Sequence, residues 1–178
     1  MSRRPGDWLR AVMAAAALLA LACGGCEARA RPPIAGAAIA DRIVIEKAAH
    51  RMSLFAGERK LATYRISLGR GGLAPKVREG DRRMPEGDYR ITDRNARSAY
   101  HLSLRIGYPT PAQVARARAA GVDPGGDIMI HGLPNGRGEI AALYRGHDWT
   151  DGCIAVSDAE MDEVWRLTRD GAAVRILP

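Results

Sequence analysis

DIMIHGLPNGRGEIAALYRGHDWTDGCIAVSDAEMDEVW, residues 127–165, is the stretch that is predicted to carry the functional site, with the rest of the chain supporting it. A short apolar run ends in His131, and a second run, Ile154 to Val156, follows directly after Cys153. Short apolar runs bounded by glycine and polar residues predict strands. Ser157 and Glu160 have the spacing of a capping box, which predicts the start of a helix. The stretch therefore places a histidine at the end of one strand and a cysteine immediately before another.

These residue types predict an acyl-transfer site. A thiol needs a neighbouring base to become a thiolate, and the usual partner is a histidine that is distant in sequence, here His131. Gly152 lets the backbone approach a substrate without a Cβ in the way. The N–H groups of Gly152 and Cys153 are candidate donors to a developing oxyanion. Attack of Cys153 on an amide would leave a thioester, which water or an amine resolves.

The N-terminus predicts an exported protein. Residues 1–30 read as a signal peptide, because three arginines precede an apolar run of twelve residues, Ala11 to Ala22. That run is too short to span a bilayer. A buried Ala-rich helix is the alternative. Small-residue cleavage motifs end at Ala22 and Ala30, and processing before Cys23 would give a lipoprotein tethered to the membrane through a lipidated Cys23.

The remaining chain divides into a linker over residues 31–41 and one domain over residues 42–178. That domain contains a single cysteine, Cys153, which has no disulfide partner in an oxidising compartment. An inert buried thiol is the alternative to a catalytic one. The formal net charge is +7; residues 1–30 hold four arginines against Asp7 and Glu27, which leaves +5 on the rest. The chain shows no nucleic-acid motif, and a mildly cationic exported domain suits an anionic envelope polymer.

The order of the predicted elements indicates a mainly β (α+β) domain with two short helices. A Gly- and Pro-rich loop, residues 69–87, separates two groups of strands. Thr110 is a predicted N-cap for a helix that Gly121 ends, and Gly171 is predicted to end the helix after Ser157. Strands are predicted at residues 43–47, 51–55, 61–68, 88–92, 100–106, 127–130 and 173–177.

A family resemblance supports the chemical interpretation. The segment Ile130 to Gly132, followed by Thr150 to Ile154, resembles the active-site signature of YkuD-type L,D-transpeptidases. The segment Glu79 to Tyr89 resembles a second segment of that family, and the combination is closest to its YafK-like branch. The resemblance covers about residues 42–177. It implies the β-sandwich-like fold of an L,D-transpeptidase catalytic domain that needs no cofactor.

The same resemblance implies the substrate and the roles of the site residues. Cys153 would attack the carbonyl of meso-diaminopimelate in a peptidoglycan stem peptide and release the terminal D-Ala. His131 corresponds to the base, and the Gly132 carbonyl would orient its ring. An amine of a second stem, or of a lipoprotein lysine, would resolve the thioester. The protein would then act in the periplasm or cell envelope.

Two positions depart from the common signature. Asp151 replaces a second histidine, and Ala155 replaces an arginine that would clamp a carboxylate. The expected substrate contacts are Asp151, His147, Arg82, Arg83 and Arg145, and the three arginines are the candidates to hold a carboxylate in place of the missing one. Solvated surface charges are the alternative for each. The YafK-like branch includes members that cleave lipoprotein from peptidoglycan, so hydrolysis, including stem-peptide trimming, is the second functional hypothesis. A non-catalytic wall-binding protein is the third.

Other classes fit the sequence less well. Papain-type and NlpC-type peptidases place the cysteine before the histidine, whereas here the histidine comes first. Sortases need a downstream arginine, for which Arg175 is the candidate. A zinc site built from His131, His147 and Cys153 lacks the usual short ligand spacings, so no metal is expected.

Overall fold

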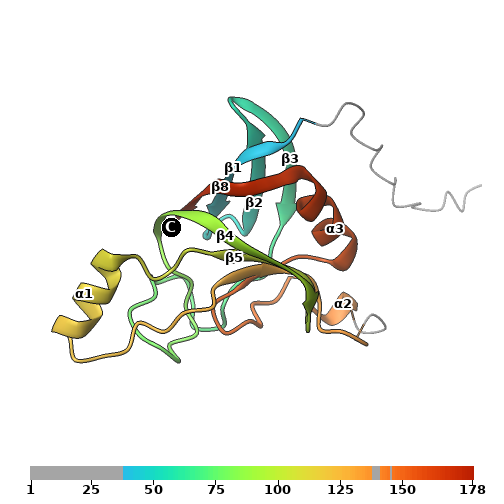
Figure 1. Cartoon of the computed structure of the whole chain (residues 1–178). Helices are drawn as coiled ribbons and strands as arrows, with labels where there is room; N and C mark the ends of the chain where they lie inside the picture. The colour runs from blue at the N-terminus through green and yellow to red at the C-terminus, as the bar shows by residue number, and fades with distance from the viewer. Residues whose placement is uncertain (1–37, 138–140, 145) are drawn as a thin grey trace, which may run out of the picture. The chain divides into compact units, whose positions relative to one another are not determined.

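Eight strands form one continuous sheet in the order β3-β2-β1-β8-β4-β5-β6-β7 (Figure 1). The structure, a computed structural model, describes residues 38–137, 141–144 and 146–178. The predicted signal peptide, Cys23 and most of the predicted linker lie outside these residues. None of the described helices is both long enough and apolar enough to cross a membrane. The elements are β1 (Ala40–Glu46), β2 (Arg51–Ala56), β3 (Arg59–Arg65), β4 (Gly87–Ser98), β5 (His101–Ile106), α1 (Pro111–Ala119), β6 (Met129–His131), α2 (Ala141–Tyr144), β7 (Ile154–Ala155), α3 (Asp158–Leu167) and β8 (Thr168–Leu177).

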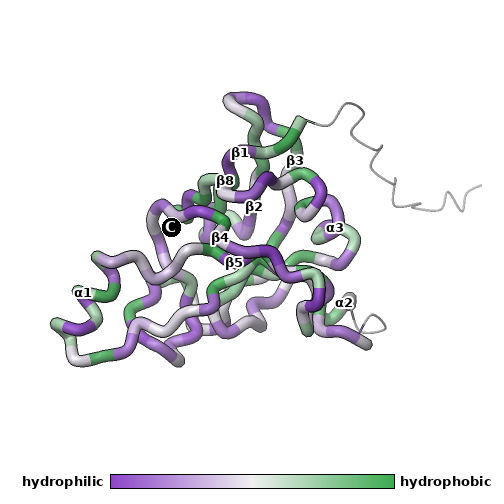
Figure 2. The backbone as a smooth tube through the Cα atoms, in the orientation of Figure 1, coloured by the Kyte–Doolittle hydropathy of each residue, from purple (hydrophilic) through white to green (hydrophobic). Residues whose placement is uncertain are grey.

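The long strand β4 joins the two halves of the sheet. Its first residues, Gly87 to Arg90, pair with β8, whereas the residues from Ile91 onward pair with β5. Both halves contribute side chains to one hydrophobic core, for example Ile43 from β1 and Ile130 from β6, which are 0% exposed. The predicted mainly β, sandwich-like class is confirmed. The tube in Figure 2 shows both hydrophobic and hydrophilic residues along this sheet, as expected for strands with one face toward the core.

The predicted strands at the start of the domain form an antiparallel meander, with one difference from the predicted ranges. Strands β1, β2 and β3 pair in sequence order, as in the partners Ile43 with Leu54 and Met52 with Tyr64. The predicted strand over residues 61–68, however, leaves the meander after Arg65. Ser67 instead pairs with Ala155, where the backbone N–H of each donates to the carbonyl of the other at 2.9 Å. This crossing carries the chain from one half of the sheet to the cysteine segment.

The helix after Ser157 ends earlier than predicted. Thr110 caps α1 as predicted, with an additional capping-box contact from Gln113, and α3 carries the predicted capping box, but α3 ends at Leu167 and β8 begins at Thr168. Gly171 lies inside β8 with φ +69° and does not end the helix. Arg94 of β4 explains the early end, because its guanidinium donates to the carbonyls of Trp165 at 2.6 Å and Thr168 at 2.8 Å. A long-range arginine thus satisfies carbonyls that a local glycine cap was expected to satisfy.

Strand β8 then pairs in parallel with β1, with Ile43 opposite Val174 and Ile45 opposite Ile176. This pairing places β1 between β2 and β8, so its inward side chains lie at the centre of the core. The fold should therefore depend strongly on them.

We expect Ile45→Ala to lower the free energy of unfolding by about 2–5 kcal/mol, because the side chain is 0% exposed and its removal leaves a cavity. Urea denaturation measures the change. Val77→Ala is the matched control, since Val77 is 57% exposed and should change the stability by less than about 0.5 kcal/mol. Equal losses in the two variants would contradict the placement of β1 in the core.

Candidate active site

Parallel pairing of β6 and β7 brings the candidate base and the candidate nucleophile together. Ile130 lies opposite Ile154 and His131 lies opposite Ala155, and the Val156 N–H donates to the His131 carbonyl at 3.0 Å. Side chains alternate between the two faces of a strand. Because Ile130 and Ile154 enter the core, His131, Ala155 and, two residues earlier, Cys153 project from the opposite face.

The His131 ring is fixed in orientation and in tautomer. Its Nδ1 lies 2.7 Å from the Gly132 carbonyl oxygen, so Nδ1 carries the proton and Nε2 is left as the basic nitrogen. The rings of Tyr100 and Trp149 lie against the imidazole, with centroids 4.6 Å and 5.7 Å away. The side chain is buried, and this burial lowers the pKa of His131. The imidazole is therefore neutral near pH 7 and able to accept a proton.

The thiol rests against the backbone that leads into β6. Cys153 Sγ donates to the Asp127 carbonyl at 3.4 Å. Burial raises the pKa of Cys153, and the nearby carboxylates of Asp127 and Asp151 raise it further; a hydrogen bond from the Met129 N–H and the charge of Lys76 oppose them. Across the described part of the chain, no hydrogen bond joins Sγ to His131. Both groups are thus neutral at rest, and the thiol proton must move during attack.

Thr150 holds the cysteine segment in a tight turn. Its hydroxyl donates to the Cys153 carbonyl at 2.7 Å and accepts from the Gly152 N–H at 3.2 Å. The Gly152 N–H is therefore already engaged, which corrects the prediction that it is a free oxyanion donor. The Cys153 N–H makes no hydrogen bond to any of the described residues and stays a candidate for that role.

Gly152 is needed for a different reason from the one predicted. Its φ is +121°, and a Cβ at this position would lie 2.7 Å from the Arg83 carbonyl oxygen. A Cβ on Gly69 would lie 2.2 Å from the Arg82 carbonyl oxygen and 2.9 Å from the Gly152 Cα. Three backbone segments thus touch directly. The absence of a side chain at Gly152 serves this packing within the protein, and its predicted role in the approach of a substrate stays a prediction.

The loop over residues 69–87 is built around a buried carboxylate. Asp81 pairs with Lys76 at 3.1 Å, and their side chains are only 6% and 4% exposed. Burial alone would raise the pKa of Asp81, but hydrogen bonds from backbone N–H groups and from Lys76 outweigh it and lower that pKa; the backbone donors are Val77, Arg78 and Arg83. The loop therefore has a fixed internal structure beside the cysteine segment.

The structure places only some of the predicted substrate contacts at the cysteine turn. Asp151 lies at the cysteine turn, and Arg82 lies near it, with Arg82 Nε 3.5 Å from Asp151 Oδ1. Arg83 turns away and donates from Nε to the Gly71 carbonyl at 3.1 Å. His147 is exposed and makes no hydrogen bond or ion pair with the described residues. Arg145 lies outside the described residues, so its predicted role stays a prediction.

Arg70 lies with Asp151 and Arg82 at the cysteine turn, although the sequence did not point to it. Its Nη2 and Nε donate to Asp151 Oδ1 at 2.8 Å and 3.1 Å. Nothing in the local sequence pairs residue 70 with residue 151. The link arises because Gly69 packs on Gly152 and the Arg70 N–H donates to the Thr150 carbonyl at 3.0 Å.

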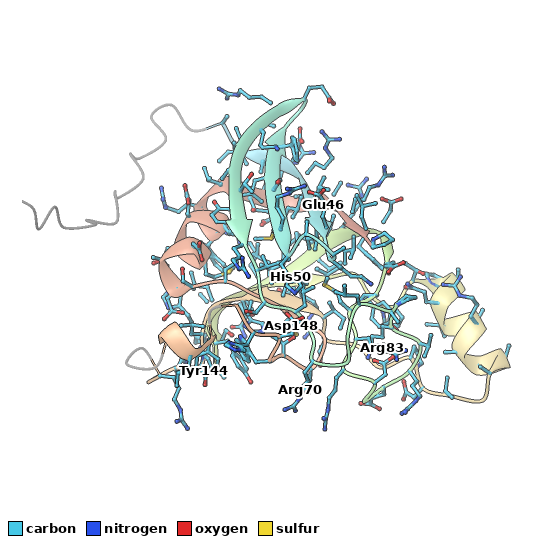
Figure 3. The ribbon with its side chains drawn as sticks, turned by 180° about the vertical axis from the view of Figure 1, so that it is seen from behind. Glu46, His50, Arg70, Arg83, Tyr144 and Asp148 are labelled. Atoms are coloured by element: carbon cyan, nitrogen blue, oxygen red, sulfur yellow. The ribbon has the colours of Figure 1, made fainter. Side chains whose placement is uncertain are left out.

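Asp148 is a second residue that sequence reasoning missed. Its carboxylate accepts from His50 Nε2 at 3.0 Å and from the Leu68 N–H at 2.8 Å. Figure 3 shows His50 and Asp148 side by side, although they are 98 residues apart in the chain. The next residue, Trp149, packs on His131. Asp148 therefore fixes the segment whose next residue, Trp149, packs against the His131 ring.

A cavity of about 160 Å³ has Trp149 in its wall, and the rest of its largely apolar lining includes Ile66, Leu133, Tyr144, Ala155 and Val156. Ala155, which occupies the place of the expected arginine, forms part of this wall. Within residues 38–137, 141–144 and 146–178, no group of three or more His, Cys, Asp or Glu side chains is arranged to hold a metal ion.

Comparison with known proteins identifies the family. The family model of the YkuD L,D-transpeptidase catalytic domain matches residues 40–176. This chain belongs to that family. It is also 32% identical over 109 residues to Escherichia coli YafK, a relative that is itself named provisionally as an L,D-transpeptidase. The matched region covers 60% of this chain and 37% of the relative's length.

Solved structures agree on the fold of this L,D-transpeptidase family member. Pgp2 of Campylobacter jejuni, described as a helical cell shape determining protein, superposes with a TM-score of 0.57 and 21% identity, over 76% of this chain and 46% of that chain. An L,D-transpeptidase of Mycobacterium smegmatis gives a TM-score of 0.51 and 12% identity, over 78% and 59% of the two chains. At these identities the likeness concerns the fold.

We expect His131→Ala to slow alkylation of Cys153 by iodoacetamide at pH 7 by about 10²-fold or more, because the variant loses the proposed general base. In the intact protein the rate should still rise above pH 8, since burial raises the thiol pKa. Rates are measured by intact-mass spectrometry.

His147→Ala is the matched control, because His147 is exposed and forms no hydrogen bond within the described chain. Its alkylation rate should match that of the unmodified protein. A slower rate for His147→Ala than for His131→Ala would reverse the assignment of the base. Thermal melts of both variants check that each is folded.

Proposed function

We propose that this chain is a cysteine-dependent acyltransferase that acts on peptidoglycan stem peptides through a thioester on Cys153. One observation carries the proposal: β6, which ends in His131, pairs with β7, which begins directly after Cys153, and the Nδ1 contact to Gly132 leaves His131 Nε2 free. This arrangement matches the requirement of a nucleophile beside an oriented base. Membership of the L,D-transpeptidase family supports the choice of substrate.

The first half-reaction forms the thioester. Cys153 Sγ rotates from the Asp127 carbonyl, His131 Nε2 takes the thiol proton, and sulfur bonds to the amide carbonyl carbon. The Cys153 N–H donates to the resulting oxyanion. When this intermediate collapses, the carbon–nitrogen bond breaks, and the leaving amine takes the proton from His131 Nε2. The imidazole returns to its neutral form.

The second half-reaction reverses these roles. An incoming amine, or water, gives a proton to His131 Nε2 as it bonds to the thioester carbon. The carbon–sulfur bond then breaks, and the thiolate regains that proton. Transfer to an amine of a second stem or of a lipoprotein lysine gives a new cross-link or attachment.

Hydrolysis is the second candidate, because the cysteine turn is open to solvent. The Asp151 side chain, two residues from Cys153, is 70% exposed, so solvent lies next to the turn that carries the cysteine. Water as the acceptor would make the protein a hydrolase that trims stem peptides or releases lipoprotein. Non-catalytic wall binding is the remaining hypothesis. In each case we propose an exported protein in the periplasm or cell envelope, with a membrane tether through Cys23 if that residue is lipidated.

We expect Cys153→Ala to abolish any change in the muropeptide profile of purified sacculi, because the thioester cannot form without the thiol. The readout is mass spectrometry of muropeptides after incubation with the purified protein. New cross-links would indicate transpeptidation, whereas shortened stems or released lipoprotein would indicate hydrolysis.

Cys23→Ala and Cys26→Ala are the matched controls, since both lie outside the proposed catalytic domain. Their activity should equal that of the unmodified protein. Undiminished turnover by Cys153→Ala would contradict the covalent mechanism. The absence of any product from the unmodified protein, together with binding to sacculi, would favour the non-catalytic hypothesis.

A further inference from the structure

We propose that Arg70, Arg82 and Asp151 form a binding site for a zwitterionic α-amino-acid head group beside Cys153. The proposal rests on the proposed function for the identity of the substrate. It assigns this site to the free end of diaminopimelate, which carries an ammonium and a carboxylate on one carbon.

The guanidinium groups of Arg70 and Arg82 both lie against one carboxylate oxygen of Asp151. Arg70 donates to Asp151 Oδ1 from Nη2 at 2.8 Å and from Nε at 3.1 Å, and Arg82 Nε lies 3.5 Å from the same oxygen. One carboxylate oxygen thus holds two guanidinium groups close together. The other oxygen, Asp151 Oδ2, makes no hydrogen bond to the described residues.

The backbone fixes this arrangement. Arg70 follows Gly69, which packs on Gly152, and the Gly71 N–H donates to the Arg82 carbonyl at 2.9 Å. The three side chains therefore come from segments that touch one another directly. Their side chains are still accessible, with exposed fractions of 49% for Arg70, 55% for Arg82 and 70% for Asp151.

The donors and acceptors left over match a zwitterion. A guanidinium has five N–H donors, and Arg70 uses only two of its nitrogens, Nε and Nη2, on Asp151. Arg70 Nη1 and the terminal nitrogens of Arg82 remain for a carboxylate, which guanidinium groups bind with two parallel hydrogen bonds. Asp151 Oδ2 remains for the ammonium. The three groups sum to +1, so the site favours a ligand that brings a carboxylate.

Exposed ion pairs contribute little to stability, so stability alone does not explain this cluster. The neighbouring cations have other contacts, because Lys76 is buried with Asp81 and Arg83 Nε donates to Gly71. Ala155 cannot hold a carboxylate. Arg70 and Arg82 therefore supply the guanidinium groups that lie beside the cysteine turn and remain open to a ligand.

The chemistry of the substrate places its head group within reach. In the proposed reaction, the attacked carbonyl belongs to one end of diaminopimelate, and the zwitterion is the other end of the same residue. Lysine at this position keeps the ammonium but lacks the carboxylate. The site should therefore distinguish the two residues through Arg70 and Arg82.

Binding to the Cys153→Ala protein, measured by isothermal titration calorimetry, tests this proposal without catalysis. The probes are the tetrapeptide L-Ala-γ-D-Glu-meso-diaminopimelate-D-Ala and the same peptide with L-lysine. We expect the diaminopimelate peptide to bind about tenfold more tightly, the size expected for one charge-assisted contact. Adding Arg70→Gln or Arg82→Gln should remove this preference and leave the affinity for the lysine peptide unchanged. Adding Asp151→Asn should weaken both peptides.

Arg59→Gln is the matched control, since Arg59 is an exposed arginine of β3 outside the cluster. Equal affinity for the two peptides overturns the proposal. A failure of both peptides to bind overturns it as well. Equal weakening of both peptides by Arg70→Gln overturns it as well. Muropeptide turnover by the unmodified protein is scored separately. Turnover without the binding preference defeats this inference alone, and the preference without turnover defeats the proposed acyl transfer alone.

Discussion

Direct backbone contact between three segments is the constraint on which the site depends. The Arg82 and Arg83 carbonyls occupy the space that a Cβ on Gly69 or Gly152 would need. These contacts fix the loop over residues 69–87 against the cysteine turn, and Asp81 then fixes the loop internally. The position of Cys153 is therefore set by packing between main chains that only glycine permits. Any side chain at these positions would have to displace the turn.

The electrostatics of the site follow from the same packing. Burial disfavours the charged form of both groups, so it raises the pKa of Cys153 and lowers that of His131. A thiolate–imidazolium pair is thus not the resting state. In the resting state the thiol donates to the Asp127 carbonyl, and the imidazole lies against Tyr100 and Trp149 with its Nε2 free. Charge develops in the transition state, where it can be stabilised selectively.

Local sequence patterns were sufficient where the structure is local. The N-cap at Thr110 and the capping box at Ser157 form as predicted, because each needs only groups three residues away. The strand positions of His131 and Cys153 also followed from short apolar runs. The parallel pairing of β1 with β8 did not, and neither did the role of Arg94 at the end of α3, because these contacts join distant segments.

The contacts that complete the site have the same long-range character. His50 contacts Asp148, and Arg70 contacts Asp151, across long separations in the chain, so each pair depends on the tertiary fold rather than on local sequence. Ala155 and Asp151 are departures from the family signature when each is considered alone. In the folded chain, Asp151 gathers two arginines from the neighbouring loop, while the small Ala155 lines an apolar cavity. The positive charge that Ala155 does not supply is thus supplied by Arg70 and Arg82 on the adjacent loop. The alanine at 155 and the aspartate at 151 are consistent with each other, because the same backbone contacts bring that loop to the cysteine.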